Sequence, residues 1–307
     1  MRAFQPISRS RHISQRNFYG LQQSPRPKFN LLLTFDAFGT LFEPRDSIAA
    51  QYAHVAQEHG IEGVEESDIR VTFKKAFKQQ ASENPNYGKK SGMTPEQWWT
   101  GVITNTFTPL TKSPPLPSLA HALLHRFASK EAYRLFPDVL PLLNRLKQDT
   151  LYDTVTLGVI TNSDHRVTSI LNDLGVGVRE YRPTVPGQPH PEQGVGDSAL
   201  IDFVAFSYDI GCEKPHRKIF DAARRIWQDL HSEDRGVLVP VHVGDDYRKD
   251  FWGAQNALWN AILVHERVME RAVANDWEKG RSGYFVESLE QVYDIVEEIA
   301  SDVMCPL

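Results

Sequence analysis

Four groups of polar residues follow apolar runs of strand length, and their side chains suit chemistry on an anionic substrate. They are Asp36 to Thr40, Thr161-Asn162-Ser163, Lys214, and Gly244-Asp245-Asp246 with Asp250. A carboxylate can act as a nucleophile, hydroxyl and amide groups can hold anionic oxygens, and a lysine can keep two anions close together. Ligands of an open parallel sheet bind outside the carboxyl ends of its strands, so we expect these residues to meet in one crevice.

The segments between these groups predict a parallel sheet with helices on both faces. Apolar runs of strand length occupy residues 31–34, 155–161, 203–207, 237–243 and 261–264. Helical spacing of apolar residues appears at 139–146 and at 167–174, where Gly175 supplies a stop. Alternating strands and helices are typical of an α/β, Rossmann-like core of three layers.

More than a hundred residues separate the first two strands, too many for a simple crossover, and their pattern is helical. The expected helices cover 46–58, 67–80, 94–107 and 119–128, the third opened by the capping residue Thr94 and then Pro95. We therefore expect a catalytic core of residues 29–43 and 135–307, with an inserted helical cap at 44–134. Residues 182–196, rich in proline and glycine, predict an exposed loop.

The charge of the chain is unevenly distributed. The 307 residues carry a net charge of −5, but residues 1–30 hold five arginines and Lys28 with no acidic residue. We interpret residues 1–28 as a leader outside the fold. A mitochondrial targeting sequence is the preferred interpretation, and a cytoplasmic or nuclear location is the alternative. The remaining acidity argues against nucleic acid as a partner, and no apolar run is long enough to cross a membrane. Two cysteines exclude a disulfide framework.

The order of the four polar groups resembles the motifs of the haloacid dehalogenase (HAD) superfamily from about residue 29 to the C-terminus. The segment 35–42, which contains Asp36, is similar to the dehalogenase-like branch. Two cap segments, 84–88 and 93–99, resemble the group called haloacid dehalogenase-like hydrolase domain-containing protein 3. The resemblance implies a HAD-like core with an α-helical cap.

The resemblance also implies a phosphatase that acts on a small phosphorylated molecule with Mg²⁺. Asp36 is then the nucleophile, and Lys214 pairs with it and with the phosphoryl group. Further expected catalytic residues are Thr40, Thr161, Asn162 and Ser163, which would hold phosphoryl oxygens, and Asp250, which would hold Lys214 or a metal-bound water. The expected metal ligands are Asp36, the backbone carbonyl of Phe38, and Asp245, while Asp246 is either a further ligand or a helix cap.

Phe38 departs from the phosphatase pattern. Superfamily phosphatases carry a second aspartate at this position, which protonates the leaving oxygen and activates water. Dehalogenases also lack it, yet those metal-free enzymes do not carry the arrangement of Asp245, Asp246 and Asp250. Three hypotheses stay open: a phosphatase, a HAD-like binding or regulatory protein with little turnover, and a 2-haloacid dehalogenase.

Basic and aromatic residues of the cap are candidates for choosing the substrate. They are Arg45, Tyr87, Lys89, Lys90, Trp98 and Trp99. Adjacent tryptophans point about 100° apart on a helix, so one is expected to pack inside while the other faces the cleft. His242, within an alternating strand, is interpreted as a packed histidine.

Overall fold

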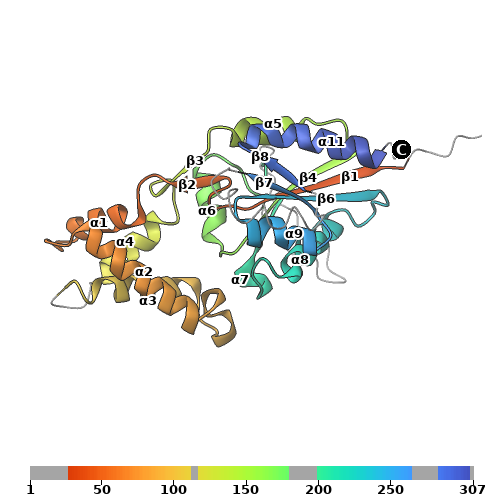
Figure 1. Ribbon diagram of the computed structural model, residues 1–307. Helices are drawn as coiled ribbons and strands as arrows, with labels where there is room; N and C mark the ends of the chain where they lie inside the picture. The colour runs from red at the N-terminus through yellow and green to blue at the C-terminus, as the bar shows by residue number, and fades with distance from the viewer. Residues whose placement is uncertain (1–26, 112–116, 180–198, 265–282, 305–307) are drawn as a thin grey trace, which may run out of the picture.

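A parallel sheet of six strands forms the centre of the described chain (Figure 1). The computed structural model describes residues 27–111, 117–179, 199–264 and 283–304. The strands, in spatial order, are β5 (Phe203–Phe206), β4 (Thr154–Thr161), β1 (Phe29–Phe35), β6 (Val237–Gly244), β7 (Asn260–Val264) and β8 (Tyr284–Val286). The predicted α/β fold class is confirmed, although β8, only three residues long, was not predicted from the sequence.

Alternate residues of β1 point to opposite faces of this sheet. Leu31 and Leu33 pack in one core cluster with α5 (Val139–Lys147), α6 (Arg166–Asp173) and α11 (Val292–Met304). Leu32 packs in a second cluster with α8 (Arg217–Leu230) and α9 (Gly253–Asn256). Both faces of β1 are therefore buried, which explains why its sequence is a continuous apolar run.

A helical group lies beyond one end of the sheet (Figure 1). It consists of α1 (Ile48–Glu58), α2 (Glu66–Glu83), η1 (Asn86–Ser91), α3 (Pro95–Phe107) and α4 (Pro117–Arg126). Ser47 and Thr94 cap α1 and α3, so these helices begin slightly later than expected. The chain enters and leaves through an antiparallel pair, β2 (Phe42–Pro44) and β3 (Tyr133–Leu135), and the proposed cap limits of 44 and 134 fall within it.

Two sequence predictions concern residues outside those that the structure describes. They are most of the leader at 1–28 and the loop at 182–196. Across the described residues, no helix is both long and apolar enough to span a membrane.

Candidate active site

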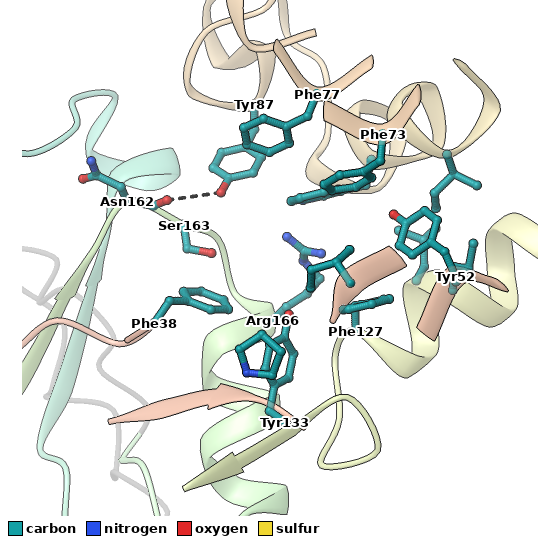
Figure 2. A pocket seen from close by; sticks show the side chains of 16 residues that line it. Phe38, Tyr52, Phe73, Phe77, Tyr87, Phe127, Tyr133, Asn162, Ser163 and Arg166 are labelled. Carbon is teal, nitrogen blue, oxygen red and sulfur yellow. Dashed lines mark hydrogen bonds between the residues drawn. The ribbon is translucent and has the colours of Figure 1, made fainter. Parts of the chain in front are cut away.

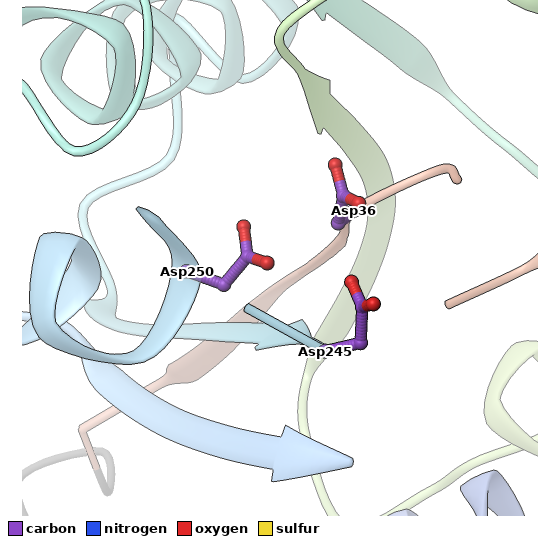
Figure 3. A group of neighbouring side chains, drawn as sticks. All are labelled: Asp36, Asp245 and Asp250. Carbon is purple, nitrogen blue, oxygen red and sulfur yellow. The ribbon is translucent and has the colours of Figure 1, made fainter. Parts of the chain in front are cut away.

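Three carboxylates converge where β1 and β6 end (Figure 3). Asp36 follows β1, Asp245 follows β6, and Asp250 lies on the next helical turn, η2 (Tyr247–Trp252). The amide of Asp36 donates to the carbonyl of Val243 at 2.8 Å, which fixes the two strand ends together. One oxygen from each carboxylate lies within 4.8 Å of the others.

Lys214 lies between two of these carboxylates. Its Nζ is 2.5 Å from Oδ1 of Asp36 and 2.7 Å from Oδ1 of Asp250, and it donates to the carbonyl of Ile160 at 2.7 Å. The Asn162 side chain holds the lysine backbone from both sides: its Nδ2 donates to the Lys214 carbonyl at 3.0 Å, and its Oδ1 accepts from the Lys214 amide at 2.6 Å. Asn162 therefore positions Lys214, and its expected role as a donor to phosphoryl oxygens stays a prediction.

Burial opposes ionisation throughout this cluster. It raises the pKa of Asp36 to about 7 against the attraction of Lys214, and it raises the pKa of Asp245 together with the charge of Asp250. Burial alone would also raise the pKa of Asp250, but Lys214 and His242 lower it below its usual range. Two carboxyl groups thus lack sufficient positive charge around them.

The donor set fits a hard divalent cation. Ionised Asp36, Asp245 and Asp250 carry three negative charges against the single positive charge of Lys214, which leaves a charge of −2. All available ligand atoms of the three residues are oxygens, the type that Mg²⁺ prefers. A cation bound here would remove the repulsion that raises the pKa values of Asp36 and Asp245.

The expected hydroxyl donors are all buried. Thr40 Oγ1 lies 3.5 Å from Oδ1 of Asp245, so this hydroxyl is at most weakly hydrogen-bonded to a candidate metal ligand. Thr161 is the last residue of β4, and Ser163 lies just beyond it at the wall of a cavity. Ser163 is therefore the hydroxyl among the three that the structure places beside space for a substrate.

Substitution of Gly39 by alanine is expected to displace Asp245. Gly39 has φ of +85°, and an added Cβ would lie within 2.4 Å of Oδ2 of Asp245, so strain and overlap combine. Gly175→Ala is a matched control, because its φ is +89° but nothing lies within 4 Å. We expect Gly175→Ala to lose about 1–2 kcal/mol of stability in urea unfolding from backbone strain alone, and Gly39→Ala to lose more because of the overlap. Only Gly39→Ala should weaken Mg²⁺ binding by calorimetry. Equal Mg²⁺ affinity in the two variants would contradict the assignment.

Asp246 does not join the carboxylate group. Its Oδ1 accepts from the amides of Arg248 and Lys249 at 2.9 Å each, and its Oδ2 pairs with Nζ of Lys249 at 2.8 Å. The structure gives this residue the role of a helix cap, and its alternative role as a further metal ligand stays a prediction.

Phe38 occupies the position where superfamily phosphatases carry their second aspartate. Its ring is 37% exposed and makes edge contacts with Phe42 and Tyr133, with centroid separations of 4.8 and 5.6 Å. The site thus has an aromatic wall at the position where the resemblance to phosphatases would place a proton donor, and the metal role of the Phe38 carbonyl stays a prediction.

His242 is buried behind the carboxylates. Its Nδ1 lies 2.9 Å from Oγ1 of Thr34, and its Nε2 lies 3.2 Å from Oδ1 of Asp250. Burial lowers the pKa of His242, which favours the neutral ring. The histidine orients Asp250 from inside the core and does not face a substrate.

A cavity of about 260 Å³ lies beside this cluster, between the sheet end and the helical group (Figure 2). Phe38, Asn162 and Ser163 contribute to it from the strand-end loops, and Tyr87 and Trp99 contribute from the helical group. The hydroxyl of Tyr87 donates to the carbonyl of Asn162 at 3.1 Å, which joins the two sides. The cavity is therefore placed to accept the part of a substrate that extends away from Asp36.

The other expected substrate residues lie elsewhere. Arg45 is exposed and donates to a backbone carbonyl at 2.8 Å. Lys89 is exposed, with its Nζ 4.5 Å from the ring centre of Tyr208, and Lys90 is exposed as well. Trp98 is buried and donates from Nε1 to the Asn84 carbonyl at 2.8 Å. Arg45 and Lys89 do not line the cavity, so their expected place there is wrong. Of the two tryptophans, Trp98 packs inside and Trp99 lines the cavity, as the helical spacing predicted.

Arg166 was missed by the sequence analysis. It begins α6, its Nε and Nη2 donate to the two oxygens of Asp164 at 2.8 and 2.7 Å, and its guanidinium lies 4.8 Å from the ring centre of Trp99. Figure 2 shows it directed into the cavity. Arg166 lies three residues beyond Ser163, just after a strand end that was already predicted to reach the site, and this position could have indicated a role there.

Comparison with known proteins finds relatives over most of the chain. The sequence model of the family described as haloacid dehalogenase-like hydrolases matches residues 32–257. An uncharacterized hydrolase from Schizosaccharomyces pombe is 34% identical over 231 residues, which are 75% of this chain and 88% of the relative. Haloacid dehalogenase-like hydrolase domain-containing protein 3 from Homo sapiens is 30% identical over 239 residues, 76% of this chain and 81% of the relative.

The crystal structure of 2-haloacid dehalogenase from Pseudomonas syringae superimposes with a TM-score of 0.53 at 20% identity, covering 89% of this chain and 99% of that one. The structural likeness supports the fold, and the family match and the sequence relatives extend over most of the chain. The chain belongs to the haloacid dehalogenase-like hydrolase family.

Proposed function

We propose that this protein hydrolyses a small phosphomonoester through an aspartyl-phosphate on Asp36, with Mg²⁺ as cofactor. The observation that carries the proposal is the contact of Asp36 with Lys214 in a cluster whose other carboxylates, Asp245 and Asp250, leave an excess of negative charge. A dehalogenase that works without a metal binds no cation that would balance this excess of negative charge.

Asp36, Asp245 and the Phe38 carbonyl would hold the Mg²⁺ ion. Bound there, the ion would supply positive charge for the anionic substrate and for the nucleophilic carboxylate. Asp250 is less available as a ligand, because its Oδ1 already contacts Lys214 and His242, and its Oδ2 accepts from the Asp246 amide at 3.0 Å.

The chain itself would carry two substitution steps. An oxygen of Asp36 forms a bond to phosphorus while the bond to the leaving oxygen breaks, and that oxygen departs with the electron pair. Lys214 keeps the carboxylate and the phosphoryl group close, and Ser163 can donate to a phosphoryl oxygen. Water then attacks the phosphorus of the aspartyl-phosphate, and the Asp36 carboxylate is released with orthophosphate.

Phe38 supports one alternative, a binding or regulatory protein that keeps the site but turns over slowly. Loss of a general acid typically costs on the order of 10²–10⁴ in rate. This alternative expects a phosphate mimic to bind in the presence of Mg²⁺ while orthophosphate release stays negligible.

Removal of the metal gives the test of the proposal. We expect EDTA to abolish orthophosphate release from 4-nitrophenyl phosphate and excess Mg²⁺ to restore it, because the cluster alone repels an anionic ester. Mg²⁺ should also raise the melting temperature, since it binds the folded site. Phosphate release that persists in EDTA would contradict the proposal, and halide release from 2-chloropropionate in EDTA would indicate the dehalogenase.

We also propose a mitochondrial location, supported by the acid-free, arginine-rich segment 1–28. A fluorescent fusion of the full chain is expected to enter mitochondria, and a fusion that begins at residue 29 is expected to stay in the cytoplasm or nucleus. The same distribution for both fusions would contradict the location.

A further inference from the structure

The cavity beside the catalytic cluster is built for an apolar group. Aromatic rings from both sides surround it, among them Phe38, Phe73, Tyr87 and Trp99. Its volume of about 260 Å³ suits a ring-sized group. Phe38 lines the cavity and lies two residues from Asp36, so the cavity adjoins the carboxylate site and offers room for the leaving group.

The described residues that line the cavity include no carboxyl, imidazole, thiol or amine side chain. Burial raises the pKa of Tyr87 to about 12, and burial likewise raises the pKa of Tyr52 and of Tyr133. None of these three hydroxyls releases a proton readily near neutral pH. A leaving oxygen in this cavity must therefore depart as an anion, which an alkoxide does poorly and a phenolate does well.

Arg166 is a charged group that faces the cavity with bonding capacity left. Arg166 uses Nε and Nη2 on Asp164, and among the described residues none accepts from its Nη1. The carboxylate of Asp164 pairs with the guanidinium at 2.7 Å, and both side chains are largely buried, so the pair carries no net charge toward the cavity. The pair therefore suits an uncharged oxygen or nitrogen acceptor on the ligand better than a second phosphate or carboxylate.

We infer that the substrate is an aryl phosphomonoester, a phosphorylated phenol whose ring enters this cavity and carries an acceptor for Nη1 of Arg166. The inference deepens the proposed phosphatase function and rests on it for the reactive carboxylate. The bond between phosphorus and the aryl oxygen breaks as Asp36 bonds to phosphorus. The aryl oxygen leaves with the electron pair as a phenolate and takes its proton from water.

The test compares phenyl, benzyl and glycerol 3-phosphate with the wild-type protein and Mg²⁺. Phenyl phosphate should exceed benzyl phosphate in kcat/KM by about 100-fold or more, the typical contribution of an absent general acid. Benzyl phosphate, with an alkyl leaving oxygen but a ring, should exceed glycerol 3-phosphate by about tenfold through burial of the ring. Glycerol 3-phosphate turned over as fast as phenyl phosphate would overturn the inference.

A variant that fills the cavity separates its role from the chemistry. Ile48 lines the cavity, so Ile48→Trp is expected to lower the ratio of benzyl to methyl phosphate turnover about tenfold. Val71→Trp is the matched control, because Val71 is 69% exposed on α2 and is not among the lining residues. A ratio that changes equally in both variants would speak against the cavity as the ring site.

A binding measurement distinguishes failure of this inference from failure of the phosphatase proposal. Phenylphosphonate should bind the wild-type protein with Mg²⁺ about tenfold more tightly than methylphosphonate by calorimetry, and Ile48→Trp should remove the difference. If no ester is hydrolysed but this preference holds, the phosphatase proposal fails and the aryl site stands. Equal affinity for the two phosphonates overturns the aryl site whatever the turnover.

Discussion

Replacement of Asp36 by asparagine is expected to lower orthophosphate release by at least about a thousandfold, the scale seen when a nucleophile is removed. Asparagine has nearly the same shape but no anionic oxygen to attack phosphorus. Its neutral side chain also removes a buried carboxyl whose pKa is raised to about 7 by burial. A raised carboxyl pKa costs stability above the unfolded pKa, so in EDTA near pH 8 the variant should be at least as stable as the wild type.

The measurements are steady-state phosphate release and urea unfolding on the same preparations. Asp221→Asn on α8 is the control, because it removes a carboxylate whose partner is the exposed Arg217 and should leave turnover unchanged. Turnover retained by Asp36→Asn would exclude the aspartyl-phosphate, and loss of folding would show that the carboxylate is needed for the structure.

Replacement of Lys214 by methionine is expected to abolish turnover and to destabilise the fold by about 3–5 kcal/mol. Methionine fills a similar volume, but Asp36 and Asp250 lose the cation that contacts both. The pKa of Asp250 then rises above that of the unfolded chain, and the pKa of Asp36, which burial already raises to about 7, rises further. The difference in unfolding free energy from the wild type should therefore be largest above the new pKa values of the folded variant. It should shrink as the pH falls toward about 4, the carboxyl pKa in the unfolded chain.

Urea unfolding in EDTA at several pH values measures this effect. The double variant Lys214→Met with Asp250→Asn is a partner control, because it removes one of the uncompensated charges and should recover part of the stability without restoring turnover. A single variant whose loss of stability does not depend on pH, or a double variant that is no more stable, would contradict the electrostatic account.

The convergence of Asp36, Lys214, Asp245 and Asp250 could be predicted because parallel strands end at the same edge of the sheet. Long apolar runs identified five strands, whereas β8 has only three residues, too few for a periodic signal. The burial of both faces of β1 follows directly from its continuous apolar sequence.

The directions of side chains on loops could not be predicted in the same way. Asn162 faces the backbone of Lys214, and Asp246 turns back to cap η2, because the loop path decides which backbone groups lie within reach. Arg45 and Lys89 carry charges suited to a phosphate, but their long side chains lie on exposed surface, where solvation stabilises them. The position of Arg166 at the cavity depends on how α6 packs against the helical group. This packing is a tertiary contact that the residues around Arg166 in the sequence do not reveal.

Transfer of phosphorus to Asp36 can be measured by locating the phosphoryl group on that residue. Protein reacting with phenyl phosphate and Mg²⁺ is quenched in acid, reduced with borohydride and digested, and the peptide containing residue 36 is sequenced by mass spectrometry. We expect homoserine at position 36, formed from the acyl phosphate, and aspartate there when substrate or Mg²⁺ is omitted. Orthophosphate release with unmodified Asp36 under every quench, or with the phosphoryl group on another residue, would contradict this transfer.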